Sequence, residues 1–161
     1  MKKDLLFLAG LMIVIIGLLI FGSSSGSIPG VRKSLEATTT QVKIKGQVFK
    51  VEVAKTPDQH AKGLSERDSL PENAGMLFVF DKPDQYQFWM KNTKIPLDII
   101  WINQDKKIVD FYQNAQPEPA VPDSQLRRYG PSTSALYVLE LAAGTVGKYQ
   151  ITTSELVDFN L

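Results

Sequence analysis

The chain has 161 residues, of which 43% are hydrophobic and 22% are charged, and its formal net charge is +1. This size and composition predict one ordinary globular domain, and the near-neutral charge argues against a nucleic-acid partner, which requires a clustered basic surface. There is no cysteine and one histidine, His60, which excludes disulfides, cysteine-ligated zinc, lipidation on cysteine and any multi-histidine metal site. We therefore expect neither a metal site nor a cofactor, and we expect His60 to be a solvated surface residue.

The first strong feature along the chain is an uninterrupted apolar run from Leu5 to Phe21, preceded by Lys2 and Lys3. A helix of this length spans roughly 26 Å, close to the thickness of the hydrocarbon core of a bilayer. The run predicts a transmembrane helix that is either an uncleaved signal anchor or a long cleavable signal, and its length favours the anchor. The two lysines should keep the N-terminus in the cytoplasm, so the remainder of the chain should face the periplasm or the cell exterior.

The composition then divides the chain into three parts. Residues 1–22 form the predicted membrane anchor or signal sequence, and residues 23–39 form a predicted flexible linker, because they are small, polar and turn-prone. Residues 40–161 form the predicted extracytoplasmic domain, which is large enough for one hydrophobic core. If the signal is cleaved, this domain is secreted.

The folded part begins with a predicted β-hairpin followed by a helix. Two runs of strand-forming residues, Thr40–Ile44 and Gln47–Val53, flank the turn Lys45–Gly46, and the second run alternates between apolar and polar side chains. The helix should begin at Thr56, whose hydroxyl can cap it, and Gln59 three residues later completes a capping box.

The window from Met76 to Ile102 is the predicted β core, since both tryptophans lie in short aromatic and branched runs separated by turn residues. Further strands are predicted at Ile108–Tyr112 and Leu136–Leu141, with one more edge strand within Tyr149–Leu161. Asn114–Arg128 is polar and proline-rich, which predicts an exposed loop. Seven or so short strands with a single short helix predict a mainly-β domain, either a β sandwich or a partly open barrel.

The motif order resembles that of a bacterial and archaeal family called domain of unknown function 192. The motifs that carry the resemblance are Gly63-Leu64 with Arg67, the run Gly75–Phe80, the run Phe88–Asp98, and Tyr137–Leu141 followed by Gly144. The central run is the most specific, and the resemblance extends from about Val51 to Gly147. It implies a compact β sandwich and an N-terminal export signal, but it brings no established activity.

Several polar side chains lie close to the apolar strands, where a charge is costly unless it is paired or reaches water. In a structural interpretation, Arg67 or Lys91 pairs with Asp98 or Glu140, and the amide of Asn92 satisfies backbone groups of its loop. In a functional interpretation, the same region lines a ligand site with an apolar wall. The ligand-binding residues would then be Arg67, Trp89, Lys91, Asn92 and Asp98, with Phe88 beside Trp89.

Two classes of function follow, and a third remains open. The first is a non-catalytic, membrane-anchored module that binds a small ligand, an envelope polymer or a protein partner. The second is a hydrolase that uses Asp98 and Glu140 as a pair of catalytic carboxyl groups, a pairing that depends on their separation in space. The third is a subunit of a membrane complex, in which the helix Leu5–Phe21 does more than anchor.

Overall fold

The computed structural model describes residues 38–161. The predicted membrane helix Leu5–Phe21 and nearly all of the predicted linker lie outside these residues. Within the described part of the chain, no helix is both long enough and apolar enough to cross a bilayer.

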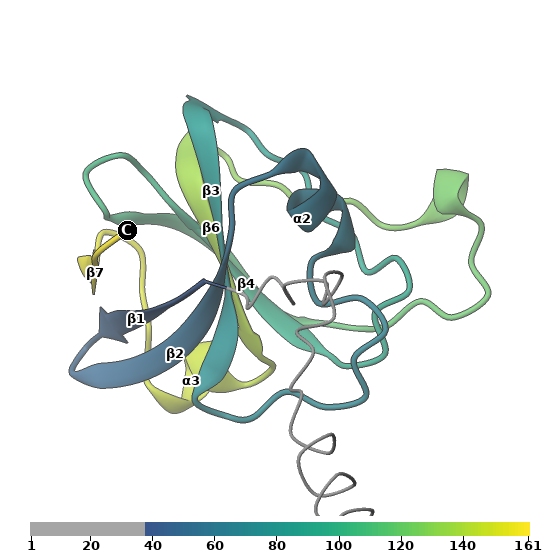
Figure 1. Cartoon of the computed structure of the whole chain (residues 1–161), viewed down its shortest axis with the longest axis horizontal. Coiled ribbons are helices and arrows are strands. Elements are labelled where there is room, and N and C mark those ends of the chain that lie inside the picture. The colour runs from purple at the N-terminus through teal and green to yellow at the C-terminus, as the bar shows by residue number, and fades with distance from the viewer. Residues whose placement is uncertain (1–37) are drawn as a thin grey trace, which may run out of the picture. The chain divides into compact units, whose positions relative to one another are not determined.

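One seven-stranded sheet, in the order β5-β4-β6-β3-β2-β1-β7, forms the domain. It curls into a half-barrel with short helices beside it (Figure 1). Neighbouring strands are antiparallel except for β2 and β3, which run parallel and are joined through α2. In chain order the elements are β1 (Thr39–Ile44), β2 (Gln47–Ala54), α2 (Pro57–Lys62), β3 (Ala74–Asp84), β4 (Leu97–Ile102), β5 (Ile108–Ala115), the 3-10 turn η1 (Asp123–Gln125), β6 (Ala135–Ala142), α3 (Thr145–Lys148) and β7 (Val157–Phe159).

The mainly-β class and the number of strands are confirmed, but the sandwich alternative is wrong. The parallel pairing of β2 with β3 and the antiparallel pairing of β3 with β6 make one continuous hydrogen-bonded sheet, so the partly open barrel describes the fold. A second short helix, α3, was not predicted. It has only four residues and follows Gly144, whose φ of 87° lies in the left-handed region.

The start of the domain follows its local sequence closely. Lys45 and Gly46 both have positive φ, at 49° and 83°, which is the geometry of a tight hairpin turn. The capping box of α2 is present: the amide of Gln59 donates to the Thr56 hydroxyl at 3.3 Å, and the Gln59 side chain accepts from the Thr56 amide at 3.0 Å. The helix ends at Gly63, whose φ is 48°.

The central window is only partly strand. The strands β3 and β4 are present, and all six residues of β4 are buried. The segment 86–93 between them is not a strand of the sheet, although Phe88 forms an isolated bridge with Tyr129. Trp101 in β4 is 1% exposed, whereas Trp89 in this segment is 40% exposed, so only one of the two tryptophans belongs to the core.

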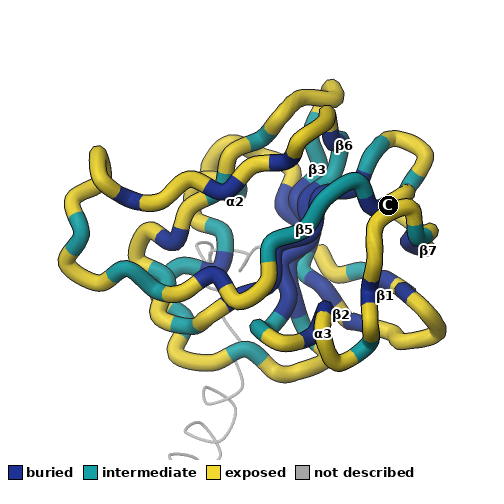
Figure 2. The backbone as a smooth tube through the Cα atoms, turned by 180° about the vertical axis from the view of Figure 1, so that it is seen from behind, coloured by how far each residue is buried: buried dark blue, intermediate teal, exposed yellow. Residues whose placement is uncertain are grey.

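Each face of the sheet carries its own hydrophobic cluster, and the buried strands occupy the middle of the domain in Figure 2. Strand β6 shows the alternation: Leu139 and Leu141 belong to the first cluster, and Val138 belongs to the second. The first cluster also includes Val146 of α3 and residues of the C-terminal segment. The second includes Leu64, which follows α2, and Met90 of segment 86–93. The elements that cover this second face enclose the candidate site.

Candidate functional site

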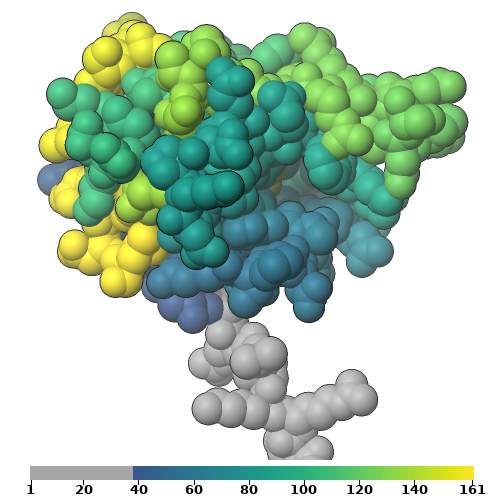
Figure 3. Space-filling model, turned by 90° about the horizontal axis from the view of Figure 1, so that it is seen from above, coloured from purple at the N-terminus to yellow at the C-terminus, as the bar shows by residue number. Residues whose placement is uncertain are grey.

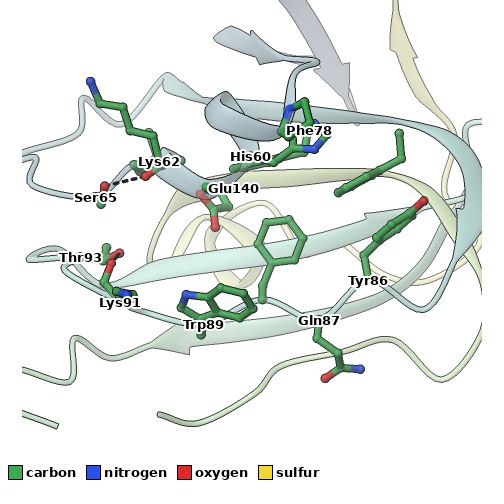
Figure 4. A pocket seen from close by; sticks show the side chains of 16 residues that line it. His60, Lys62, Ser65, Phe78, Tyr86, Gln87, Trp89, Lys91, Thr93 and Glu140 are labelled. Carbon is green, nitrogen blue, oxygen red and sulfur yellow. Dashed lines mark hydrogen bonds between the residues drawn. The ribbon is translucent and has the colours of Figure 1, made fainter. Parts of the chain in front are cut away.

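A cavity of about 410 Å³ opens between α2, the sheet and segment 86–93 (Figure 4). Its lining is dominated by aromatic and other apolar groups, and among the described residues Glu140 is the one acidic side chain that lines it. The aromatic side chains that line it are Phe78, Phe80, Tyr86, Phe88 and Trp89. The other lining residues are Pro57, His60, Ala61, Lys62, Gly63, Leu64, Ser65, Gln87, Lys91 and Thr93.

The aromatic walls are held in place by contacts between rings. Phe80 and Tyr86 stack with their centroids 3.5 Å apart and their planes 11° apart. Phe78 and Phe88 meet edge to face at 4.9 Å. Because Phe78 and Phe80 lie two residues apart on β3, their side chains share one face of the sheet, which is the face that α2 covers. The walls therefore come from β3 and from the segment that follows it.

Glu140 of β6 contributes a buried carboxyl group to this cavity. It lies opposite Met76 of β3 and Ile99 of β4 in the sheet register and is 5% exposed. Figure 4 shows its carboxyl group directed toward the space between α2 and Trp89. Burial raises the pKa of Glu140 to about 8, against the opposing effect of the nearby Arg67 charge, and no side-chain hydrogen bond within the described residues contributes. The cavity thus contains a largely neutral carboxylic acid near neutral pH.

Gly75 of β3 allows the backbones of β3 and β6 to approach each other closely beside Glu140. A Cβ atom built on Gly75 would lie 2.3 Å from the carbonyl oxygen of Glu140. Any side chain there would push the backbone of β6 away from β3. The glycine therefore helps to fix the position of Glu140.

Arg67 forms an ion pair with Glu52, not with Asp98 or Glu140 as one interpretation of the sequence expected. Its two terminal nitrogens lie 2.5 and 2.7 Å from the two carboxylate oxygens of Glu52. The hydrogen bond from Arg67 lowers the pKa of Glu52 below its ordinary value. Arg67 does not line the cavity, and it influences Glu140 through its charge.

Asp98 is fully buried and is satisfied by backbone amides instead of a cation. Its carboxylate accepts hydrogen bonds from the amides of Asn114 at 2.8 Å, Gly144 at 3.2 Å and Val146 at 2.8 Å. The predicted pairing of Asp98 with Arg67 or Lys91 is therefore wrong. Three amide donors stabilise a buried carboxylate without a second charge, and they tie β5 and α3 to the beginning of β4.

Asp98 and Glu140 also lie on opposite faces of the sheet. Asp98 is opposite Leu141, whose side chain belongs to the first cluster, whereas Glu140 is opposite Ile99 of the second. Since side chains alternate between the two faces of a strand, the two carboxyl groups cannot share a cleft. The predicted catalytic pair does not form.

Three of the predicted ligand-binding residues differ in their position relative to the cavity: Lys91, Trp89 and Asn92. Lys91 lines it, but its ammonium group is paired with Asp123, which lies in the segment between β5 and β6 that projects from the domain in Figure 3. Trp89 also lines the cavity, and the guanidinium of Arg128 lies 3.9 Å from the centre of its ring. Asn92 does not line the cavity; it occupies a turn with a φ of 53°.

His60 is the clearest lining residue that sequence reasoning missed. Instead of being fully solvated, it is half-buried, with Nε2 3.1 Å from the carbonyl oxygen of Ala54 and its ring centre 4.5 Å from that of Phe80. His60 lies three residues after Pro57, the first residue of α2. This spacing could have indicated that its side chain lies on the helix face that meets the sheet. Across residues 38–161, no group of three or more His, Cys, Asp or Glu side chains is arranged to hold a metal ion.

Comparison with known proteins identifies the family. The profile of DUF192, described as an uncharacterized ACR, matches residues 39–159. A crystal structure from Sinorhizobium meliloti 1021, described only provisionally as a transcription regulator, has a TM-score of 0.68 and 30% sequence identity, covering 76% of this chain and 95% of that one. The structure of a protein of unknown function from Novosphingobium aromaticivorans DSM 12444 has a TM-score of 0.67 and 31% sequence identity, covering 80% of this chain and 89% of that one. No curated protein matches. The chain belongs to the DUF192 family.

Proposed function

We propose that this domain is a non-catalytic module that binds a small ligand in the cavity between α2 and segment 86–93. The observation that carries the proposal is a cavity with aromatic walls and one buried carboxyl group, Glu140, that has no hydrogen-bond partner among the described residues. Its volume of about 410 Å³ lies within the range of small-molecule sites. This size favours a small ligand over a polymer or a folded partner.

The arrangement of the cavity supports binding more than hydrolysis. Within residues 38–161, Glu140 is the only acidic residue that lines the cavity, and Asp98 lies on the other face of the sheet. The hydroxyl of Ser65, which also lines the cavity, donates to the carbonyl oxygen of Lys62 at 2.6 Å. Among the described lining residues, the cavity therefore presents neither the second carboxyl group that a carboxylate-pair hydrolase needs nor a serine hydroxyl hydrogen-bonded to a general base, which nucleophilic catalysis by serine needs.

We further propose that the run Leu5–Phe21 tethers this module to the cell membrane with its cavity outside the cytoplasm. This part of the proposal rests on the length and apolarity of the run and on Lys2 and Lys3 before it. Protease added to spheroplasts should digest the domain. Complete protection until the membrane is lysed would reverse the proposed orientation.

A fragment screen tests ligand binding directly. The domain covers 95% of the crystallised Sinorhizobium chain, so residues 38–161 should fold without the segment before them. In two-dimensional NMR spectra, small aromatic and aliphatic fragments should shift signals from residues that line the cavity. Ala61→Trp, on an exposed lining residue of α2, should abolish these shifts, and Val48→Trp, on an exposed residue of β2 outside the cavity, should not. Fragment binding that both variants retain would contradict the proposal.

A further inference from the structure

We propose that the ligand of this cavity is an organic ammonium ion, whose nitrogen binds the Glu140 carboxylate while its apolar body packs against the aromatic walls. This assignment rests on the proposed binding function and gives it a chemical class. It combines three features of the site: the single acidic side chain among the described lining residues, the position of the nearby cations in other pairs or away from that side chain, and the aromatic composition of the walls.

The carboxyl group of Glu140 has no cationic partner in contact within residues 38–161, because two of the nearby cations are engaged with other groups and a third points away from it. Arg67 is held by both oxygens of Glu52. Lys91 is held by Asp123. The ammonium group of Lys62 extends away from Glu140 in Figure 4. A cationic ligand that enters the cavity would therefore supply the ionic partner that the protein does not.

The aromatic walls suit the same ligand. Aromatic faces attract ammonium groups through their electron-rich centres, and such cages recognise organic cations. One ring of this site already binds a cation from its own chain, since Arg128 lies against Trp89. The stacked pair Phe80–Tyr86 and the edge-to-face pair Phe78–Phe88 provide apolar surface for the body of the ligand. An anionic ligand would instead meet a buried acid.

Binding should be accompanied by release of a proton. The carboxylic acid of Glu140 gives its proton to solvent, and the ammonium ion, which keeps its own protons, then balances the carboxylate charge. Burial raises the pKa of Glu140 to about 8. At about pH 7, roughly nine in ten empty sites would therefore carry this proton and release it on binding. At about pH 9, roughly one in ten would do so. A neutral ligand releases none.

Isothermal titration calorimetry on residues 38–161 tests this inference with 2-phenylethylammonium and its neutral analogue 2-phenylethanol. Titrations in two buffers of different ionisation enthalpy give the number of protons released. We expect the ammonium ion to bind at least about tenfold more tightly than the alcohol, which corresponds to one charge-assisted contact. We also expect it to release close to one proton at about pH 7, falling toward zero at about pH 9.

Glu140→Gln keeps the shape of the side chain and removes its charge. It should lower the affinity for the ammonium ion to that for the alcohol, and Glu66→Gln, on an exposed residue outside the cavity, should change neither affinity. Equal binding of both probes, unchanged by Glu140→Gln, would overturn the ammonium assignment and leave the proposed function standing. Failure of both probes to bind at millimolar concentration would also overturn the assignment. The fragment screen would then decide separately whether the cavity binds any small ligand.

Discussion

Replacing Glu140 with glutamine should change how the stability of the domain depends on pH. Burial raises the pKa of this carboxyl group from 4.5 to about 8. Between these two pH values the folded protein holds a proton that the unfolded chain has lost. The free energy of unfolding of the wild-type protein should therefore fall, through this group, as the pH rises across this window.

The magnitude follows from the size of the pKa shift. A difference of one pKa unit corresponds to about 1.4 kcal/mol, so the shift from 4.5 to about 8 amounts to an upper value of about 5 kcal/mol. Glutamine has nearly the shape of the protonated acid and does not ionise. We expect Glu140→Gln to be nearly neutral at about pH 5 and to be more stable than the wild type by roughly 3–5 kcal/mol at about pH 9.

Urea denaturation of both proteins at a series of pH values measures this difference. The ion pair of Glu52 with Arg67 makes stability depend on pH in the opposite direction. The lowered pKa of Glu52 contributes stability that is lost as the pH falls below about 4.5. It lies outside the window and is common to both proteins, so it cancels in their difference. A difference in unfolding free energy that stays constant from about pH 5 to about pH 9 would refute the account of Glu140 as a buried neutral acid.

Three further substitutions test the surroundings of the site. Gly75→Ala should destabilise the domain by at least about 3 kcal/mol, because its Cβ would lie 2.3 Å from a backbone oxygen of Glu140; a normal melting temperature would show that the strands can separate without cost. Asp98→Asn should lower the free energy of unfolding by about 2–4 kcal/mol, because the NH2 group of the new amide would face some of the three backbone donors. The control Asp105→Asn, at an exposed residue, should lower it by less than about 0.5 kcal/mol. Equal denaturation midpoints for the two variants would contradict this prediction. Arg67→Met removes the charge that lowers the pKa of Glu140. In the same denaturation series, the pH range over which the free energy of unfolding falls should therefore extend to higher pH. An extension to lower pH would contradict this effect of Arg67 on Glu140.

Features that depend on local chemistry could be predicted from the sequence. The hairpin at Lys45–Gly46 and the capping box of Thr56 with Gln59 each depend on residues only a few positions apart. The strands β4 and β6 followed from short runs of branched apolar residues. The curl of one continuous sheet could not be predicted in the same way, because it depends on the parallel pairing of β2 with β3 across α2.

The site was less predictable because its geometry depends on register and on partners far apart in the chain. Asp98 and Glu140 look equivalent in sequence, yet the register of β4 with β6 turns them to opposite faces. Lys91 is paired with Asp123, which comes from a loop 32 residues away. Trp89 lies in an aromatic run and Trp101 in a run of branched residues, but only Trp101 is in a strand of the sheet. Side-chain type identified candidates, and tertiary pairing determined their roles.

A crystal of residues 38–161 soaked with 2-phenylethylammonium would show whether the cavity beside Glu140 binds a ligand. We expect electron density for the ligand between α2 and Trp89, with its nitrogen about 2.7–3.2 Å from a carboxylate oxygen of Glu140. A cavity closed by its own side chains, or a ligand bound only elsewhere on the domain, would contradict this expectation.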